Sequence, residues 1–405
     1  MTELDPSAKR GAVALEEPDP SEYLVIGDFG GRVTEPTLID RDNFDRVMAS
    51  LLVNLAGTQM RELEDFHPDR LLARFRMFEP DQPAVETRAA ALKAKRETPT
   101  PNLGEILQPG SLLEQIAGGG DPFDRYVREL AAAHASAPEA KDDPSDAARC
   151  GLLRALLHHP RFQAIEAAWR GLDFVIRRCD SELDAQERVY IAQFPWIHAR
   201  TDLNDARDLR QVRMLRLLAK RRWRAVIALF SFSGEAASIE FLGRMALLAS
   251  HAGIPFIAEG SADMGEHWEE LRRIPEAGYV GLALPRFLTR LPYGAKTSAV
   301  DTLAFEEMPE APAHQHYLWG NPALACLALL MAGQNALTLE NLPLHTYRAN
   351  GEWQATPPSE VWMTESEAQA LIDMGLMPLV SFKDAGRVRL AGWRAMNGKA
   401  LRFPS

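Results

Sequence analysis

Residues 225–258 read AVIALFSFSGEAASIEFLGRMALLASHAGIPFIA, and this stretch decides the class of fold. It opens with an apolar run (225–232), continues with apolar residues at helical spacing (236–251), and returns to an apolar run (254–258). Gly253 and Pro255 mark the junction, because a glycine commonly ends a helix and a proline often follows it. Strand, helix and strand in this order predict an α/β layer with at least partly parallel pairing.

The segments around this unit extend the same alternation. We predict helices over residues 147–158, 162–178 and 206–220, and a strand over 189–193. The predicted fold class is therefore α/β, with a mixed, partly parallel sheet flanked by helices and a small α+β module at the N-terminus.

The first 146 residues suggest a different organisation. A strand is predicted at 23–26, an amphipathic helix at 43–56, and a second helix that begins at Asp65 or Pro68 and runs to residue 77. Between the first two, the glycines of residues 27–31 lack the spacing of a nucleotide-binding loop and predict a tight turn. We interpret 1–80 as a small module, 81–146 as a linker with short helices (111–116 and 123–133), and 147–405 as the main α/β domain.

Composition excludes several classes of protein. The 405 residues include 45 basic and 56 acidic side chains, and the net charge of -11 opposes general binding to nucleic acid or anionic membrane. No apolar run approaches the roughly 18 residues of a membrane span, and the acidic N-terminus lacks the features of a signal peptide. Cys150, Cys179 and Cys326 are too scattered for a disulfide framework. We expect a soluble cytoplasmic protein.

One basic strip departs from the acidic average. Seven cations crowd into 15 residues: Arg210, Arg213, Arg216, Lys220, Arg221, Arg222 and Arg224. The strip fits the solvated face of a helix that leads into a strand, or a docking strip for an acidic neighbouring subunit. A nucleic-acid site is disfavoured, because no aromatic residues alternate with the charges.

Residues that carry chemistry in enzymes are present without their usual partners. His158 and His159 are adjacent, whereas metal ligands on one helix face need a spacing of about four residues. His314 and His316 form the other close pair, and they too fit surface or core positions. The chain has no GxSxG elbow, and the carboxylates of Glu306, Glu307 and Asp373 fit surface or salt-bridge roles. We therefore expect no enzyme activity, cofactor, metal or small-molecule substrate.

Four blocks of sequence resemble one family. They are LLHHPRFQAIEAAWRGL (156–172), YVGLALPRFLTRLPYG (279–294), FEE with YLWGNPA (305–307 and 317–323), and LPLHTY with PSEV and MGLMPL (342–347, 358–361 and 374–379). Their residues and their order along the chain resemble those of the large subunit of the contractile tail sheath of type VI secretion systems. The first two blocks match family segments of the forms H-x-P-x-F-Q-x-L-E-x-x-W-R-G-L and LPRFLLRLPYG.

The N-terminal module resembles the small sheath subunit of the same systems. Residues 26–29 (IGDF) and 65–69 (DFHPD) are similar to that subunit's DF-x-P element, and 111–116 (SLLEQI) resembles the start of the large subunit. The resemblance thus implies a fusion of the two subunits, with a junction near residue 105.

Two departures from the family pattern affect what the resemblance implies. The usual RG-x-x-GG segment is replaced by AGQNALTLEN (332–341), and the sequence ends soon after residues 387–390, so the large-subunit part is C-terminally shortened. Family members are joined by strands exchanged through terminal arms, and a shortened chain could lack a donor or acceptor edge. A minimal fused sheath and a divergent relative that caps, seeds or regulates a sheath both remain open.

The blocks also supply the residues that we suspect of structural or interface roles. Trp169 and Trp319 lie in apolar surroundings and are predicted core anchors. Arg286 and Arg290 could form local salt bridges that fix their loop, or contacts to another subunit or the inner tube. The full set is Trp169, Arg170, Gly171, Pro285, Arg286, Arg290, Pro292, Tyr293, Trp319 and Asn321.

The function implied by the resemblance is that of a sheath subunit. Such a protein polymerises around an inner tube and contracts to deliver effectors, with other sheath subunits, the tube and the baseplate as partners. Recycling by a ring-shaped unfoldase is a further family expectation, but its recognition helix cannot be placed in this sequence. The alternative is a non-polymerising accessory or regulatory protein that binds sheath or baseplate.

Overall fold

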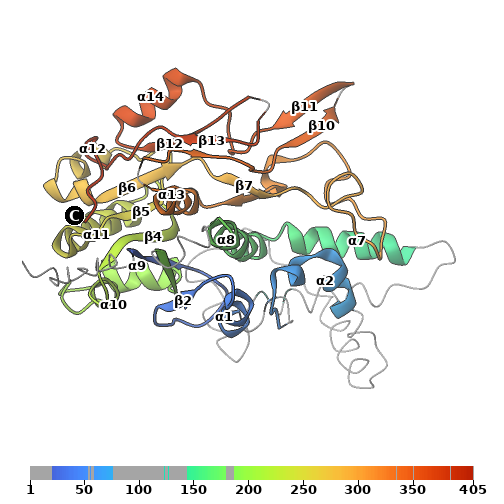
Figure 1. Ribbon diagram of the computed structural model, residues 1–405, viewed down its shortest axis with the longest axis horizontal. Coiled ribbons are helices and arrows are strands. Elements are labelled where there is room, and N and C mark those ends of the chain that lie inside the picture. The colour runs from blue at the N-terminus through green and yellow to red at the C-terminus, as the bar shows by residue number, and fades with distance from the viewer. Residues whose placement is uncertain are drawn as a thin grey trace, which may run out of the picture.

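The computed structural model describes residues 21–52, 55, 59–75, 123, 126, 144–178, 187–333, 335–349, 351–383 and 385–404. A nine-stranded sheet runs through the described part of the chain in the order β2-β3-β1-β4-β5-β6-β12-β13-β9 (Figure 1). The strands are β1 (Ser21–Gly27), β2 (Thr37–Ile39), β3 (Glu187–Gln193), β4 (Trp223–Ser231), β5 (Phe256–Glu259), β6 (Val280–Leu284), β9 (Thr338–Leu339), β12 (Met377–Ser381) and β13 (Val388–Leu390).

The pairing is parallel in the centre of the sheet and antiparallel at its edges. β3, β1, β4, β5, β6 and β12 run parallel to one another, whereas β2, β13 and β9 pair antiparallel with their neighbours. Two small antiparallel sheets accompany it, one of β7 (Phe287–Arg290) with β8 (Leu318–Gly320) and one of β10 (His345–Ala349) with β11 (Glu352–Thr356). The predicted α/β class with a mixed sheet is confirmed.

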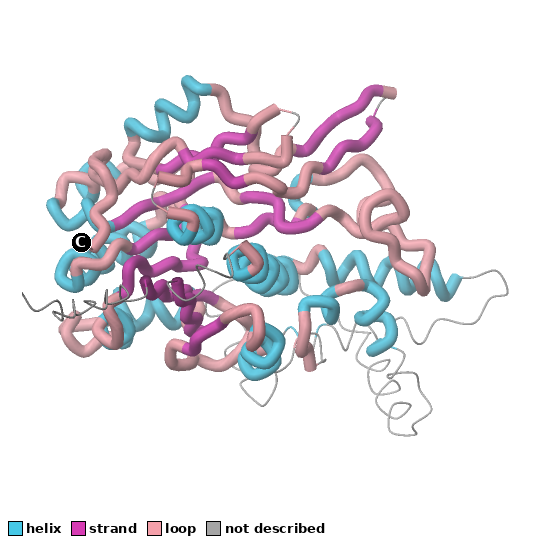
Figure 2. Tube along the Cα trace, in the orientation of Figure 1, coloured by secondary structure: helices cyan, strands magenta, loops and turns pink. Residues whose placement is uncertain are grey.

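Helices cover both faces of the sheet (Figure 2). One face packs against α1 (Phe44–Leu51), α7 (Pro144–Leu157), α8 (Pro160–Ile176) and α13 (Pro322–Met331). The other face packs against α9 (Trp196–Asn204), α10 (Arg213–Leu218), α11 (Ala236–Ala252) and α12 (Trp268–Leu271). Shorter elements complete the described residues: η1 (Leu63–Phe66), α2 (Pro68–Phe75), η3 (Pro275–Tyr279), η4 (His314–His316) and α14 (Glu365–Asp373).

Strand β1 contributes side chains to the hydrophobic cores on both faces of the sheet. Tyr23 and Val25 point into the core beneath α8, and Leu24 and Ile26 point into the core beneath α11; all four are fully buried. Alternate side chains of a strand face opposite ways, so a continuous apolar run is what a strand needs between two helical layers. The segment that we interpreted as a separate N-terminal module thus contributes a central strand to the sheet, between β3 and β4. The proposed domain boundaries and origin of this segment stay predictions.

Several local predictions agree with the structure and others need correction. Gly253 ends α11 in the left-handed conformation, as predicted. The turn after β1 is also present, with Gly30 at φ +87° and its N–H bonded to the side chain of Asp28 at 2.9 Å. The single helix predicted over 206–220 is wrong. Residues 205–212 form turns between α9 and α10, and the carboxylate of Asp202 accepts the first two N–H groups of α10 at 2.8 and 2.9 Å. The helix predicted at 111–116 and most of that at 123–133 lie outside the described residues.

Candidate functional site

A buried ion-pair network joins two of the sequence blocks. Glu166 of α8 is fully buried and accepts hydrogen bonds from Arg170 and from Arg290 at the end of β7, each with an Nε–Oε1 distance of 2.7 Å. Arg290 also donates from Nη1 to Glu307 at 2.8 Å. Two carboxylates therefore balance two guanidiniums, which is the condition under which buried charges are tolerated.

Hydrogen bonds to Tyr293 complete this network. The hydroxyl of Tyr293 accepts from Arg170 at 2.8 Å, and the backbone N–H of Tyr293 donates to Glu307 at 2.8 Å. The guanidinium of Arg290 also lies 4.3 Å from the centre of the tyrosine ring. The loop that follows β7 is thus tied to α8 by the hydroxyl of Tyr293 and to Glu307 by its backbone.

The electrostatics of the network favour the charged forms of Glu166 and Arg290. Burial acts to raise the pKa of Glu166, but the nearby charges of Arg290 and Arg170 outweigh it, and the pKa lies below its usual value. Burial acts to lower the pKa of Arg290, yet Glu166 and Glu307 raise it well above normal. The opposite charges of Glu166 and Arg290 thus hold each other in place within the network.

Two histidines from different sequence pairs meet beside the network. The rings of His158 and His316 are stacked, with centroids 3.8 Å apart and planes 1° from parallel. His158 Nε2 lies 3.7 Å from Glu307 Oε1. Burial, the neighbouring His316 and the nearby arginines lower the pKa of His158 to about 4. The described residues contain no group of three or more His, Cys, Asp or Glu side chains placed to hold a metal ion.

The N-terminal segment covers the outer side of the network. The ring of His67 lies edge-on to Tyr293 at 4.9 Å, and Phe66 packs edge-on against Phe162 of α8 at 5.5 Å. Asp69 accepts the backbone N–H groups of Asp301 and Thr302 at 3.0 and 2.9 Å. Here the structure brings together the DFHPD stretch of the N-terminal segment and two blocks of the main domain. A pocket of about 570 Å³ opens at this junction.

Trp169 and Gly171 belong to the same helix, α8. The indole of Trp169 is fully buried, donates to the carbonyl oxygen of Phe29 at 3.1 Å, and packs against the ring of Phe44 at 5.7 Å. An added Cβ at Gly171 would meet Leu324, so the glycine allows α8 to approach α13 closely. The prediction of Trp169 as a core residue agrees with this burial.

The carboxyl ends of the parallel strands are filled by the protein's own side chains. Open α/β sheets commonly bind ligands in a crevice at this edge. Here Gln193 at the end of β3 is fully buried and donates to Asp28 at 2.8 Å and to the carbonyl oxygen of Gly31 at 3.0 Å. With Trp169 bonded to the next residue of the same loop, Phe29, this part of the edge is packed as structure.

Two more of the predicted residues, Arg286 and Asn321, belong to a second, smaller cluster farther along that edge. Arg286 donates from Nε to Glu360 at 2.8 Å and lies 4.0 Å from Glu259 at the end of β5. Glu259 accepts from Ser231 at 2.7 Å and from Asn321 at 3.1 Å. Burial raises the pKa of Glu259, against the opposing effects of Ser231 and Arg286. Both candidate arginines are therefore engaged in local ion pairs.

Asn321 and three further predicted residues have structural positions. Asn321 caps α13 by accepting the N–H of Ala323 at 3.0 Å. Trp319 is buried, as predicted for a core anchor, and donates to the carbonyl oxygen of His314 at 3.0 Å. Pro285 follows β6 through a cis peptide bond, and the carbonyl oxygen of Pro292 accepts a hydrogen bond from Thr297.

Sequence reasoning missed the acidic half of the network. Glu307 was assigned to a surface or salt-bridge role; it is in a salt bridge, but the surface alternative is wrong because the residue is 1% exposed. Glu166 was not singled out. Its spacing of four residues from Arg170 on the same helix was the available signal.

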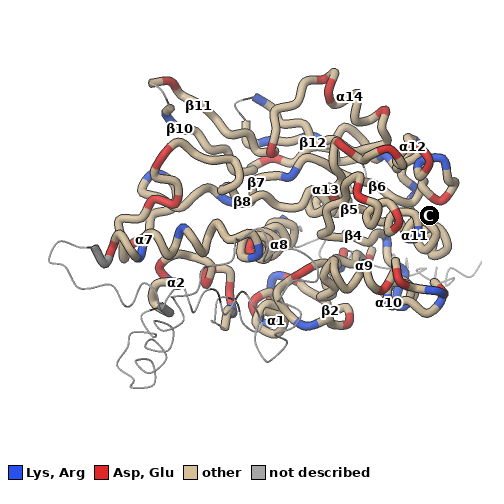
Figure 3. The backbone as a smooth tube through the Cα atoms, turned by 180° about the vertical axis from the view of Figure 1, so that it is seen from behind, with Lys and Arg blue, Asp and Glu red and all other residues tan. Residues whose placement is uncertain are grey.

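The basic strip pairs mainly with acids of the N-terminal segment. Figure 3 shows segments of Lys and Arg beside α10. Glu35 forms ion pairs with Arg213 and Lys220, and Glu22 of β1 pairs with Arg221 at 2.8 Å. These contacts satisfy much of the strip within the chain. Ion pairs with this exposure contribute little each, about 0–1 kcal/mol, so the contacts orient the N-terminal segment more than they stabilise it.

The arrangement of these blocks can be compared with known proteins. The sequence profile of the VipB family, described as "EvpB/VC_A0108, tail sheath N-terminal domain", matches residues 146–266 and 261–397. The chain belongs to this tail sheath family. A curated relative is the "Type VI secretion system sheath protein TssC1" of Pseudomonas aeruginosa (strain PAO1), which is 24% identical over 300 residues. The alignment covers 63% of this chain and 60% of that protein. The tail sheath profile thus includes α8, the β7 loop and Glu307, so the whole ion-pair network lies inside the matched region.

None of the described helices is both long enough and apolar enough to cross a membrane.

Proposed function

We propose that this chain is a structural subunit of a type VI secretion sheath, which polymerises around an inner tube and contracts to drive effector delivery. The observation that carries the proposal is the match of the tail sheath family to residues 146–397, which include every strand of the large sheet except β1 and β2. Other sheath subunits, the inner tube and the baseplate would be its partners. The subunit would act in the cytoplasm without a cofactor and without catalysis.

The geometry of the site supports a structural role. The sequence blocks converge on a charge-balanced network whose two carboxylates are at most 1% exposed. Such a network holds α8, β7 and the loop to Glu307 in one arrangement, because any shift would leave a buried charge unpaired. A subunit that transmits force between neighbours would benefit from a body that moves as a unit, while its contacts with other subunits rearrange.

The contacts of the N-terminal segment support a fusion of small- and large-subunit functions. β1 lies in the centre of the sheet, and Asp69 bonds to the loop at 301–302. Two polypeptides that associate permanently would make contacts of this kind, and here one chain supplies both sides. We propose that this chain does the work of both subunits.

Sedimentation velocity of the purified full-length chain over a range of concentrations tests the proposal. A sheath subunit should shift to large species as concentration rises, and ionic strength should alter that shift if charged rims take part. A single monomeric species at every concentration and salt would contradict self-assembly of this chain. It would favour the alternative of an accessory protein that binds sheath or baseplate.

A further inference from the structure

The hairpin of β10 and β11 stands away from the body of the molecule, but its root is fixed. It projects at the upper right of Figure 1, and none of its ten strand residues is buried. At its root, the hydroxyl of Tyr317 lies 2.7 Å from Nδ1 of His345 and accepts from Thr356 at 2.8 Å. His345 and Thr356 are opposite each other in the hairpin. The hairpin is therefore held at its base while its strands stay accessible to solvent.

The other face of the hairpin forms one wall of a groove. Arg348 lies opposite Trp353, and Thr346 lies opposite Ala355. Because alternate residues of a strand share a face, these four side chains lie on the face that is turned away from His345. Three of the four line a groove of about 810 Å³.

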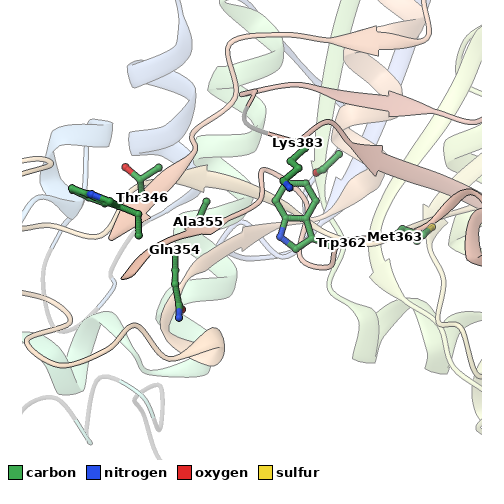
Figure 4. A pocket seen from close by; sticks show the side chains of 8 residues that line it. Thr346, Gln354, Ala355, Trp362, Met363 and Lys383 are labelled. Atoms are coloured by element: carbon green, nitrogen blue, oxygen red, sulfur yellow. The ribbon is translucent and has the colours of Figure 1, made fainter. Parts of the chain in front are cut away.

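The second wall of the groove comes from the loop before α14 and from the end of β12. In Figure 4, Trp362, Met363 and Lys383 stand across the groove from Thr346 and Ala355. The floor includes Ser381, whose hydroxyl already accepts the N–H of Ser359 at 3.0 Å. Binding in this groove would therefore depend mainly on the side chains of its two walls.

The loop that carries Trp362 is fixed on both sides. Before it, Glu360 donates its backbone N–H to the carbonyl oxygen of Arg286 at 2.8 Å and accepts from the guanidinium of Arg286 at 2.8 Å. After it, Thr364 caps α14 by accepting the N–H of Glu367 at 3.2 Å. The two walls thus hold their shape without a ligand, and a preformed groove spends little of its binding free energy on ordering its own residues.

Large apolar side chains are exposed at this groove. Trp353 on one wall is 76% exposed and Trp362 on the other is 43% exposed, and the adjacent Val361 is 52% exposed. Tryptophan is among the residues that contribute most binding free energy at protein interfaces, and contiguous exposed apolar surface marks binding sites. The two walls therefore offer places for large apolar side chains of a ligand.

The charge at the groove is positive, although the net charge of the chain is -11. Among the described residues that line the groove, Lys383 is charged and none is acidic. Arg348 adds a second cation on the face of Trp353, and its guanidinium donates to the carbonyl oxygen of Gly351 at 3.3 Å. The carboxylate of Glu360 is taken up by Arg286. The groove is therefore complementary to a ligand that carries carboxylates beside apolar groups.

We propose that this groove binds an extended acidic peptide of another protein, in which large apolar residues stand next to Asp or Glu. The apolar side chains pack against Trp353 and Trp362, and the carboxylates pair with Lys383 and Arg348. A flat membrane surface fits less well, because it would leave the floor of the groove unfilled. The proposal goes beyond the sheath function, and it does not depend on self-association of the chain.

Selection of peptides by the immobilised full-length chain tests the proposal. The probe is a display library of random peptides of about ten residues, which span roughly 33 Å when extended. The selected sequences should combine large apolar residues with Asp or Glu. A synthetic peptide of such a sequence should bind about tenfold more weakly when its carboxylates are replaced by amides, and its binding should weaken as salt rises.

Variants at the groove locate the binding of that peptide. Trp353→Ala and Lys383→Glu should each weaken it about tenfold or more, because each removes one kind of contact at an exposed position. The matched controls are Leu247→Ala on α11 and Lys399→Glu, which make similar changes at exposed positions that do not line the groove. Both controls should bind the peptide as the wild type does.

Three results would overturn the proposal: no peptide is selected, the selected peptides lack carboxylates, or Trp353→Ala binds them as well as the wild type does. Vesicles of phosphatidylcholine and phosphatidylserine provide a further comparison, and the chain should not sediment with them. Sedimentation with vesicles that Trp353→Ala abolishes would assign the groove to a membrane surface instead. Because peptide binding is measured whether or not the chain assembles, failure here leaves the proposed sheath function standing.

Discussion

Replacing Glu307 with glutamine tests the buried ion-pair network most sharply. The substitution keeps the size of the side chain and one oxygen that can accept from the N–H of Tyr293, but it removes one of two buried negative charges. Arg170 and Arg290 would then share the single carboxylate of Glu166. Removing one partner of a buried ion pair costs about 3–5 kcal/mol, and we expect Glu307→Gln to lower the free energy of unfolding by this amount.

The neighbouring glutamate provides a matched control. Glu306 is exposed, and Glu306→Gln makes the same chemical change one residue away. We expect a loss of about 0.5 kcal/mol or less from the control. Urea unfolding followed by tryptophan fluorescence should show a lower midpoint for Glu307→Gln with an unchanged slope.

A double variant separates charge imbalance from lost packing. Arg290→Met combined with Glu307→Gln leaves Glu166 paired with Arg170, so the buried charges balance again. We expect the double variant to be more stable than the sum of the two single losses predicts, by about 1–3 kcal/mol. If Glu307→Gln and Glu306→Gln shift the midpoint equally, the reasoning about the network is refuted.

Three further changes have defined outcomes. The pKa of His158 is depressed in the folded protein to about 4, so its contribution to stability is complete above about pH 6.5 and is lost as the pH falls toward 4. His158→Phe should reduce the loss of unfolding free energy between pH 7 and 4.5, and His251→Phe on the exposed face of α11 should not. Gly31→Ala should destabilise the fold by about 1–3 kcal/mol, because the new Cβ would collide with the backbone carbonyl of Leu51 at the end of α1. Gly151→Ala, in open space on α7, should stabilise the fold by about 0.5–1 kcal/mol. Thermal unfolding of the two variants compares these effects. Trp169→Phe should lower the free energy of unfolding by about 1–3 kcal/mol, because the buried carbonyl oxygen of Phe29 loses its hydrogen-bond donor. Urea unfolding measures this loss, and a midpoint equal to that of the wild type would contradict it.

The fold class was accessible from sequence because central strands such as β4 and β6 are largely apolar. The run at 225–232 and the helix that follows it have the patterns of a buried parallel strand and a covering helix, and both are present. Over residues 206–220, the spacing of apolar residues did not predict where the helix begins. There the break between α9 and α10 depends on a side chain, Asp202, that accepts the first N–H groups of α10 from another helix. A contact of that kind leaves no periodic signal.

The site could be predicted only in part, because some of its interacting residues lie far apart in the sequence. The pair of Glu166 and Arg170 could be found from its spacing on one helix. Arg290 reaches Glu166 across 124 positions in the sequence, and spacing gives no access to such a pair. The integration of β1 into the sheet was hidden for the same reason, because its partners β3 and β4 begin more than 160 residues later. Resemblance to the sheath family found the blocks, and the structure shows that their side chains meet.

Negative-stain electron microscopy of the purified full-length chain, expressed without other sheath components, tests the central claim most directly. If one polypeptide performs the work of both sheath subunits, the grids should show hollow cylinders or stacked rings of uniform diameter. Particles of monomer size at high protein concentration, from a preparation that is folded by circular dichroism, would contradict that claim.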